Sequence, residues 1–181
     1  MTDRQMTDVA TLRERARRHI EQGAITESYG TDPRIVIGML NEALATEIVC
    51  LLRYKRHYYT AQGLASDSVR NEFLEHARQE EEHADWLAAR IVQLGGEPDF
   101  SPQGLAERSH AEYVAGTSLI DMIKEDLVAE RVAIESYSEM IKSIGGRDVT
   151  SRRLLERILA VEEEHAEDLL SLIQGMQQGT R

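Results

Sequence analysis

Four long segments of the chain carry apolar residues at alternating steps of three and four, the spacing that lines one face of an α-helix. Each segment begins and ends near glycine, proline or capping residues, which mark helix boundaries. The first has the clearest start, because Asp32 is a favourable N-cap and Pro33 suits the first helical position. The pattern predicts helices over about residues 33–62, 66–94, 118–144 and 149–175.

The lengths of the connections predict how these helices are arranged. The first and second helices, and the third and fourth, are joined by only a few residues, so each pair should form an antiparallel hairpin. The connection between the second and third helices, from Glu97 to Thr117, has about 21 residues and can run the height of a bundle. The expected fold is therefore an all-α four-helix bundle with one long crossover. Only a handful of mostly polar residues follow the fourth helix, so no fifth C-terminal helix is expected.

The N-terminal part predicts a short amphipathic helix over about residues 8–22, which Gly23 should end. Its arginines alternate with acidic residues, which favours a solvated helix face over a nucleic-acid-binding arm. The expected organisation is an N-terminal extension over residues 1–30, a bundle domain over 31–177 and a tail over 178–181.

Composition narrows the function. The chain has 181 residues, enough for one domain, and a net charge of −11. That charge disfavours nucleic-acid and anionic-membrane partners and suits cations, although it also suits ordinary solubility. The single cysteine, Cys50, excludes an intrachain disulfide and a cysteine-based metal site. We see no signal peptide and no apolar run of about 18 residues, so we expect a cytoplasmic protein without a membrane partner.

Charged residues interrupt the apolar face of each long helix. The interruptions are Glu47 in the first helix, Glu80 with His83 in the second, Glu130 in the third and Glu162 with His165 in the fourth. The spacing repeats, with 33 residues from Glu47 to Glu80 and 32 from Glu130 to Glu162. Each half of the chain thus supplies one Glu and then one Glu-x-x-His on core-facing positions. Buried carboxylates are normally paired or bound to metal, so this pattern predicts a metal site.

Two alternatives bear on this prediction. With six histidines and 32 acidic residues, chance gives roughly one acidic residue three positions before a histidine. We assign Glu107 and His110, in the crossover, to chance. The second alternative is a metal-free buried ionic network, but four carboxylates and two imidazoles leave surplus negative charge. Two divalent ions would balance it, and this donor set suits iron or manganese better than structural zinc.

The chain resembles the ferritin superfamily, specifically bacterioferritins and the Dps-like proteins that carry a bacterioferritin-type di-iron centre. The matching segments are LNEALATEIVCLLRY, EEEHADWLAARIVQLGG, EDLVAERVAIESY and VEEEHAEDLL. The resemblance implies that Glu80 and Glu162 bridge two irons. It also implies that Glu47 and His83 complete one iron, that Glu130 and His165 complete the other, and that Tyr54 lies beside the centre.

The resemblance implies an iron-storage ferroxidase that binds two iron ions per subunit, with manganese as the alternative metal. Such a protein oxidises Fe(II) with O₂ or H₂O₂ and deposits mineral inside a homo-oligomeric shell. The missing fifth helix favours twelve subunits over twenty-four. In haem-binding bacterioferritins a Met lies between the Glu and the His of the second helix, where this chain has Glu81 and Glu82, so we expect no haem.

Other functions stay open at this point. A soluble di-iron or di-manganese oxidoreductase of the oxygenase or catalase type could use the same site without storing iron. A DNA-protecting scaffold is disfavoured by the net charge. His57 and His76 are either auxiliary iron ligands or ordinary polar residues, and Cys50 is either near the metals or a small core residue.

Overall fold

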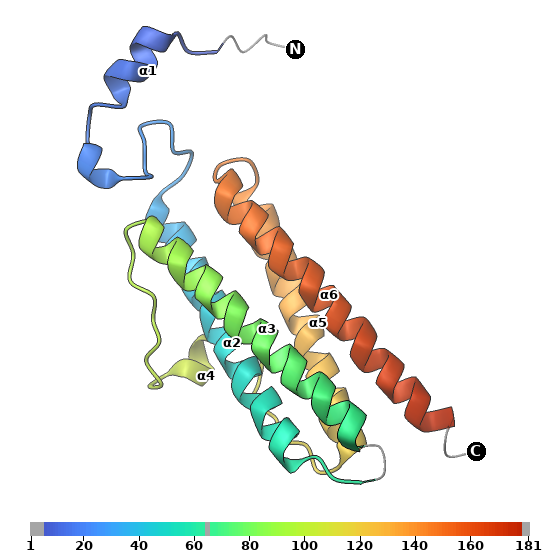
Figure 1. Ribbon diagram of the computed structural model, residues 1–181. Helices are drawn as coiled ribbons and strands as arrows, with labels where there is room; N and C mark the ends of the chain where they lie inside the picture. Colours follow the sequence, from blue (N-terminus) through green and yellow to red (C-terminus); the bar gives the residue numbers. More distant parts are fainter. Residues whose placement is uncertain (1–5, 64–65, 179–181) are drawn as a thin grey trace.

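The computed structural model describes residues 6–63 and 66–178, and every regular element within these ranges is helical. The four long helices are α2 (Pro33–Thr60), α3 (Ser66–Gln93), α5 (Leu119–Ile144) and α6 (Val149–Gln178). The helices α2 and α3 form one antiparallel hairpin and α5 and α6 form the other, and the two hairpins pack into a four-helix bundle (Figure 1). The predicted fold is confirmed. The first helix ends slightly earlier than expected, and the fourth continues past Gly175.

Local chemistry explains where the helices begin and end. Asp32 caps α2 by accepting a hydrogen bond from the backbone N–H of Arg34, and Ser118 caps α5 in the same way by accepting from Asp121. Gly145 follows α5 with φ of 56°, a left-handed value that ends the helix and begins the turn into α6.

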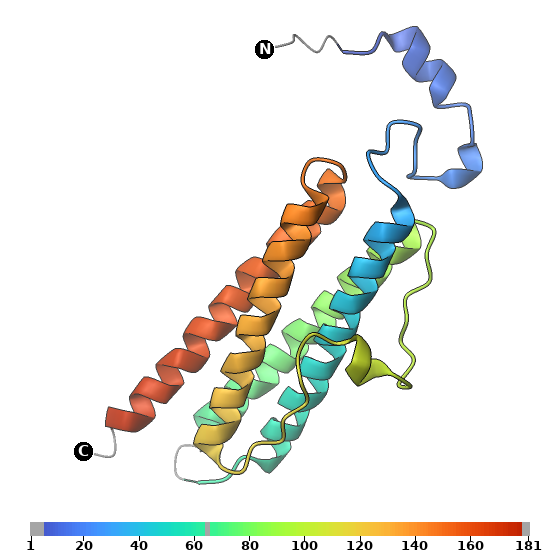
Figure 2. The same cartoon turned by 180° about the vertical axis from the view of Figure 1, so that it is seen from behind.

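The crossover from α3 to α5 runs along α2 from one end of the bundle to the other (Figure 2). It makes α3 and α5 parallel, as the connection length predicted. The crossover also contains a one-turn helix, α4 (Leu105–Arg108), which was not predicted because four residues carry no helical periodicity. Gly116, near the end of the crossover, has a φ of 66°. A Cβ at this position would lie 2.8 Å from Met122, so the close approach requires glycine.

The N-terminal segment differs from the expectation of one helix over residues 8–22. The helix α1 (Val9–Arg15) ends early, and a 3₁₀ turn, η1 (Ile20–Gln22), follows after His19 adopts a left-handed φ of 52°. Leu12 and Ile20 remain 47% and 80% exposed. The segment stands off the end of the bundle (Figure 1), so its apolar face has no core among the described residues to pack against.

Two apolar clusters fill the bundle, one toward each end. The first includes Leu40, Leu87 and Leu155, and the second includes Phe73 and Leu169. By length and composition alone, α2 meets the criterion for a helix that could cross a membrane, which the sequence analysis did not anticipate. Half of its most apolar 18-residue stretch is buried inside the bundle. A core helix of a helical domain can meet the same criterion of length and composition.

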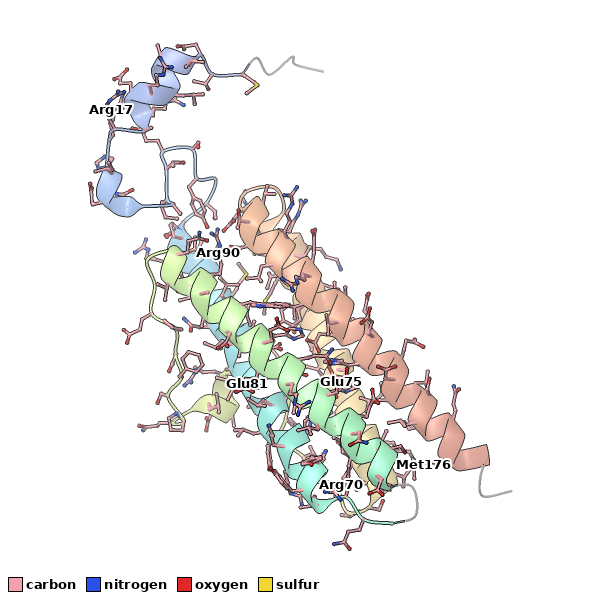
Figure 3. The ribbon with its side chains drawn as sticks, in the orientation of Figure 1. Arg17, Arg70, Glu75, Glu81, Arg90 and Met176 are labelled. Atoms are coloured by element: carbon pink, nitrogen blue, oxygen red, sulfur yellow. The ribbon has the colours of Figure 1, made fainter. Side chains whose placement is uncertain are left out.

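A polar network joins the end of α3 to the start of α6. Arg90, labelled near the end of α3 in Figure 3, donates to both carboxylate oxygens of Asp148 at 3.0 Å and to Ser151 at 2.8 Å. Asp148 also accepts a 2.6 Å hydrogen bond from Tyr29, in the segment before α2. The network fixes this end of the bundle from both hairpins.

Candidate metal centre

The predicted site residues meet in the middle of the bundle, between the two apolar clusters. Each is at most 2% exposed, and all four long helices contribute. The residues are Glu47 from α2, Glu80 and His83 from α3, Glu130 from α5, and Glu162 and His165 from α6. The Glu and the His of each pair are three residues apart, about one helical turn, so both side chains reach the same face.

These residues form two groups, and within each group one donor atom from each residue lies within 4.8 Å of the others. Both groups contain Glu80 and Glu162. One group adds Glu47 and His83, and the other adds Glu130 and His165. Each group therefore offers four donors to one cation, with two carboxylates positioned between the groups. The arrangement fits the predicted ligand sets, while the bridging role of Glu80 and Glu162 stays a prediction.

The imidazoles turn their Nδ1 atoms toward the carboxylates. Nδ1 of His83 lies 2.9 Å from Glu162 and 3.0 Å from Glu47. Nδ1 of His165 lies 3.5 to 3.8 Å from three carboxylates, while its Nε2 donates a 2.7 Å hydrogen bond to the side-chain oxygen of Gln79. Because Gln79 takes the Nε2 hydrogen, Nδ1 of a neutral His165 carries the lone pair that a metal needs.

Two tyrosines hold the outer carboxylates. The hydroxyl of Tyr54 donates to Glu130, as its predicted place beside the centre requires, and the hydroxyl of Tyr137 donates to Glu47 at 2.5 Å. No role was predicted for Tyr137 from the sequence. The signal was present, because Tyr137 follows Glu130 by seven residues just as Tyr54 follows Glu47.

Several buried polar atoms of the centre have no hydrogen-bond partner. They are Oε1 of Glu80, Oε2 of Glu130, both carboxylate oxygens of Glu162 and Nδ1 of His165. Buried polar atoms rarely stay unpaired, since the lost hydration is costly. These are carboxylate oxygens and an imidazole nitrogen, so a divalent cation would satisfy them together. The oxygen-rich set with one imidazole per group suits iron or manganese.

The electrostatics of the centre also favour the binding of divalent cations. Burial first, and then the neighbouring carboxylates, raise the pKa values of Glu80 and Glu162 well above the ordinary value. Burial acts on Glu130 too, but His165, Glu162 and Tyr54 outweigh it and lower the pKa of Glu130. Without cations the centre would therefore take up protons on its shared carboxylates. Divalent cations would replace those protons.

His76 lies directly beside the centre. Its ring stacks on that of His165 with 3.9 Å between the ring centroids, and its Nδ1 is 3.2 Å from the Tyr54 hydroxyl oxygen. Burial and then His165 lower the pKa of His76 to about 3, so the ring is neutral at pH 7. Its Nε2 has no hydrogen-bond partner.

His57 belongs to a different network. Its Nδ1 lies 2.8 Å from Asp126, and its Nε2 lies 3.0 Å from the carbonyl oxygen of Ala115 in the crossover. Arg53, 1% exposed, donates to the other oxygen of Asp126 at 2.7 Å. Both nitrogens of His57 are engaged, so it is a structural residue and not an auxiliary ligand.

The remaining candidates also lie apart from the centre. His110 lies 3.6 Å from Glu42 and contacts Thr46. The pair of Glu107 and His110 therefore supplies no donor to the metal centre. Cys50 is buried in a small cluster with Ala111 and Ala129. Burial raises the pKa of its thiol, which keeps it protonated.

Comparisons with known proteins agree with this geometry. Residues 37–178 match the family described as "Ferritin-like domain". The chain is 30% identical over 131 residues to a bacterioferritin of Desulfovibrio desulfuricans, covering 72% of this chain and 69% of that protein. It is 33% identical over 132 residues to a nutrient stress-induced DNA-binding protein of Synechococcus, covering 70% of this chain and 74% of that protein.

A solved structure extends the likeness to the fold. The bacterioferritin-related protein of Bacteroides fragilis, described as a dodecameric thioferritin, superposes with a TM-score of 0.80 at 30% identity. The match covers 83% of this chain and 91% of that one. The likeness therefore extends over most of this chain.

Proposed function

Since this chain belongs to the ferritin-like domain family, we propose that it oxidises Fe(II) to Fe(III) at the buried centre and stores the product as a mineral. One observation carries the proposal. Two groups of four donors share Glu80 and Glu162, and these carboxylates have buried oxygens without a hydrogen-bond partner. Such a pair of sites holds two Fe(II) ions close enough to give up two electrons to one oxidant.

The reaction balances with either oxidant. Two Fe(II), O₂ and two protons give two Fe(III) and H₂O₂, while two Fe(II), H₂O₂ and two protons give two Fe(III) and two waters. The protein contributes charge and position. Glu47 and His83 hold one Fe(II) and Glu130 and His165 hold the other. Because the pKa values of Glu80 and Glu162 are raised, Fe(II) displaces protons from these carboxylates on binding.

Storage requires a closed assembly, and we propose a shell of twelve chains. The support is the similar protein of Bacteroides fragilis, which is described as dodecameric. We also propose that the shell does not bind DNA, although one relative is named a DNA-binding protein, because this chain carries a net charge of −11. Retardation of DNA that weakens with added salt would contradict this.

The test measures the native particle mass and the iron content per chain before and after aerobic Fe(II) addition. We expect a shell that gains far more than two irons per chain. Replacing Glu80 and Glu162 with Ala should abolish rapid oxidation, and unchanged oxidation by this variant would overturn the assignment. A small oligomer that stops at two metals per chain would instead indicate a soluble di-iron or di-manganese oxidoreductase.

A further inference from the structure

A second cluster of donors begins where the centre ends. Glu72 and His76 lie one turn apart on α3, and Asp168 comes from α6. Nε2 of His76 lies 3.4 Å from Glu72 and 3.8 Å from Asp168, and one donor atom from each of the three residues lies within 4.8 Å of the others. The side chains are 55% exposed at Asp168, 32% at Glu72 and 1% at His76. The cluster therefore leads from solvent into the bundle.

The hydrogen bonds of His76 determine which nitrogen is free. Tyr54 has one hydroxyl hydrogen, and it goes to Glu130. The Tyr54 oxygen must then accept the hydrogen of Nδ1 of His76, 3.2 Å away. Nε2 of the neutral ring is left with a lone pair, buried, without a hydrogen-bond partner and facing two carboxylates. Lone pairs that converge in this way repel one another unless a cation lies among them.

The internal repeat of the chain shows that this cluster exists on one side only. Position for position, α3 around Glu80 corresponds to α6 around Glu162. Four and eight residues before Glu80 are His76 and Glu72, whereas the same steps before Glu162 lead to Ile158 and Leu154. Ile158 is fully buried, and both belong to the apolar packing of the bundle.

The residue six positions after each Glu completes the contrast. On α6 it is Asp168, and on α3 it is Trp86. The Trp86 ring centroid lies 5.3 Å from that of His83, and the guanidinium of Arg157 covers Trp86 at 3.6 Å. Apolar and cationic groups thus close the His83 side of the centre, while acidic groups and a free imidazole nitrogen line the His165 side.

We propose that Glu72, His76 and Asp168 bind a third divalent cation and that Fe(II) reaches the centre through this site. The binding site stands on its own geometry, and the passage of Fe(II) rests on the proposed function. His76 also has a donor atom within 4.8 Å of donors of Glu130 and His165, so the two sites are contiguous. A surface hollow on α6, lined by Glu163, Glu164, Glu167 and Asp168, supplies negative potential at the outer end.

Co(II) binding to the metal-free protein, assembled as purified, tests the site without oxidation. We expect three Co(II) per chain for the natural sequence and two for Asp168→Asn combined with Glu72→Gln. Asp85→Asn removes the same charge as Asp168→Asn from an exposed position on α3, nine residues and about two and a half turns from His76, and should keep three. Anomalous scattering from Co(II)-soaked crystals should place the third ion at Nε2 of His76.

The results separate this site from the proposed function. If the natural protein binds only two Co(II), or if the double variant keeps three, the third site is wrong even when Fe(II) oxidation is rapid. If three Co(II) bind but no oxidation occurs, the site stands and the ferroxidase proposal fails. For the access route, Asp168→Asn should slow oxidation several-fold at limiting Fe(II), whereas Asp85→Asn should not. Equal rates in the two variants would overturn the route.

Discussion

The hydroxyl of Tyr137 on α5 donates a 2.5 Å hydrogen bond to Glu47 on α2. Tyr54 on α2 makes the equivalent contact with Glu130 on α5. Each tyrosine follows the acid of its own helix by seven residues and binds the acid of the other helix. The two contacts brace α2 against α5 across the centre, and they relate the two donor groups by an approximate two-fold repeat.

Replacing Tyr137 with Phe should weaken divalent-cation binding at the group that contains Glu47 and His83. The hydrogen bond orients Glu47, and loss of such a partner typically costs about 10- to 100-fold in metal affinity or activity. Co(II) titration of the metal-free protein measures the change, which should affect one of the two central sites. Tyr59→Phe, at a residue 75% exposed, is the matched control. Equal affinity in Tyr137→Phe and Tyr59→Phe would show that the hydrogen bond does not orient a ligand.

Glu162→Gln should have opposite effects on the metal-free and metal-loaded proteins. In the metal-free protein, burial and nearby carboxylates disfavour the charged form of Glu162, so a neutral amide of the same shape should raise the melting temperature at pH 7. With Co(II) the natural protein should gain stability through binding, and the variant should gain less because Glu162 belongs to both central donor groups. Thermal melts with chelator and with Co(II) measure both. A variant that melts lower in chelator would contradict the prediction.

The centre could be predicted from sequence because each ligand interrupts an apolar stripe of known period. Helical geometry converts the positions of Glu47, Glu80, Glu130 and Glu162 into one buried layer, and the long crossover fixes which helices are parallel. The family resemblance, and not the apolar stripe, placed Tyr54 beside the centre.

Residues whose role depends on a partner from another helix could not be predicted in this way. Gln79 is a polar residue at a half-buried position, and only the packing of α6 against α3 brings His165 to it. Arg53 and Asp126 are 73 residues apart, and no local pattern pairs them. The N-terminal helix was overpredicted for the converse reason, since its local periodicity has no packing partner within the described chain.

The buried ion pair between Arg53 and Asp126 should be sensitive to the loss of either partner. Asp126→Ala leaves the Arg53 guanidinium buried without its carboxylate, and breaking such a pair costs about 3–5 kcal/mol. Urea unfolding of the metal-free protein should show this loss. Glu135→Gln, at an exposed position of α5, should change stability little.

The double variant Arg53→Met with Asp126→Leu tests the origin of that cost. Replacing both charges with apolar groups removes the unpaired ion, so the double variant should recover much of the stability that Asp126→Ala loses. If it is as unstable as Asp126→Ala, the cost comes from lost packing or from the partner that His57 loses, and not from an unpaired Arg53.

Asp148 should make the stability of the bundle depend on pH in the acid range. Burial disfavours its charge, but hydrogen bonds from Ser151, Tyr29 and Arg90 outweigh burial and lower its pKa. A lowered folded-state pKa stabilises the fold above the unfolded value of about 3.9, and the contribution disappears as pH falls through the folded value. The melting-temperature gap between the natural protein and Asp148→Asn should therefore be largest near pH 7 and shrink below about pH 4. A constant gap, or one matched by Asp85→Asn, would refute this.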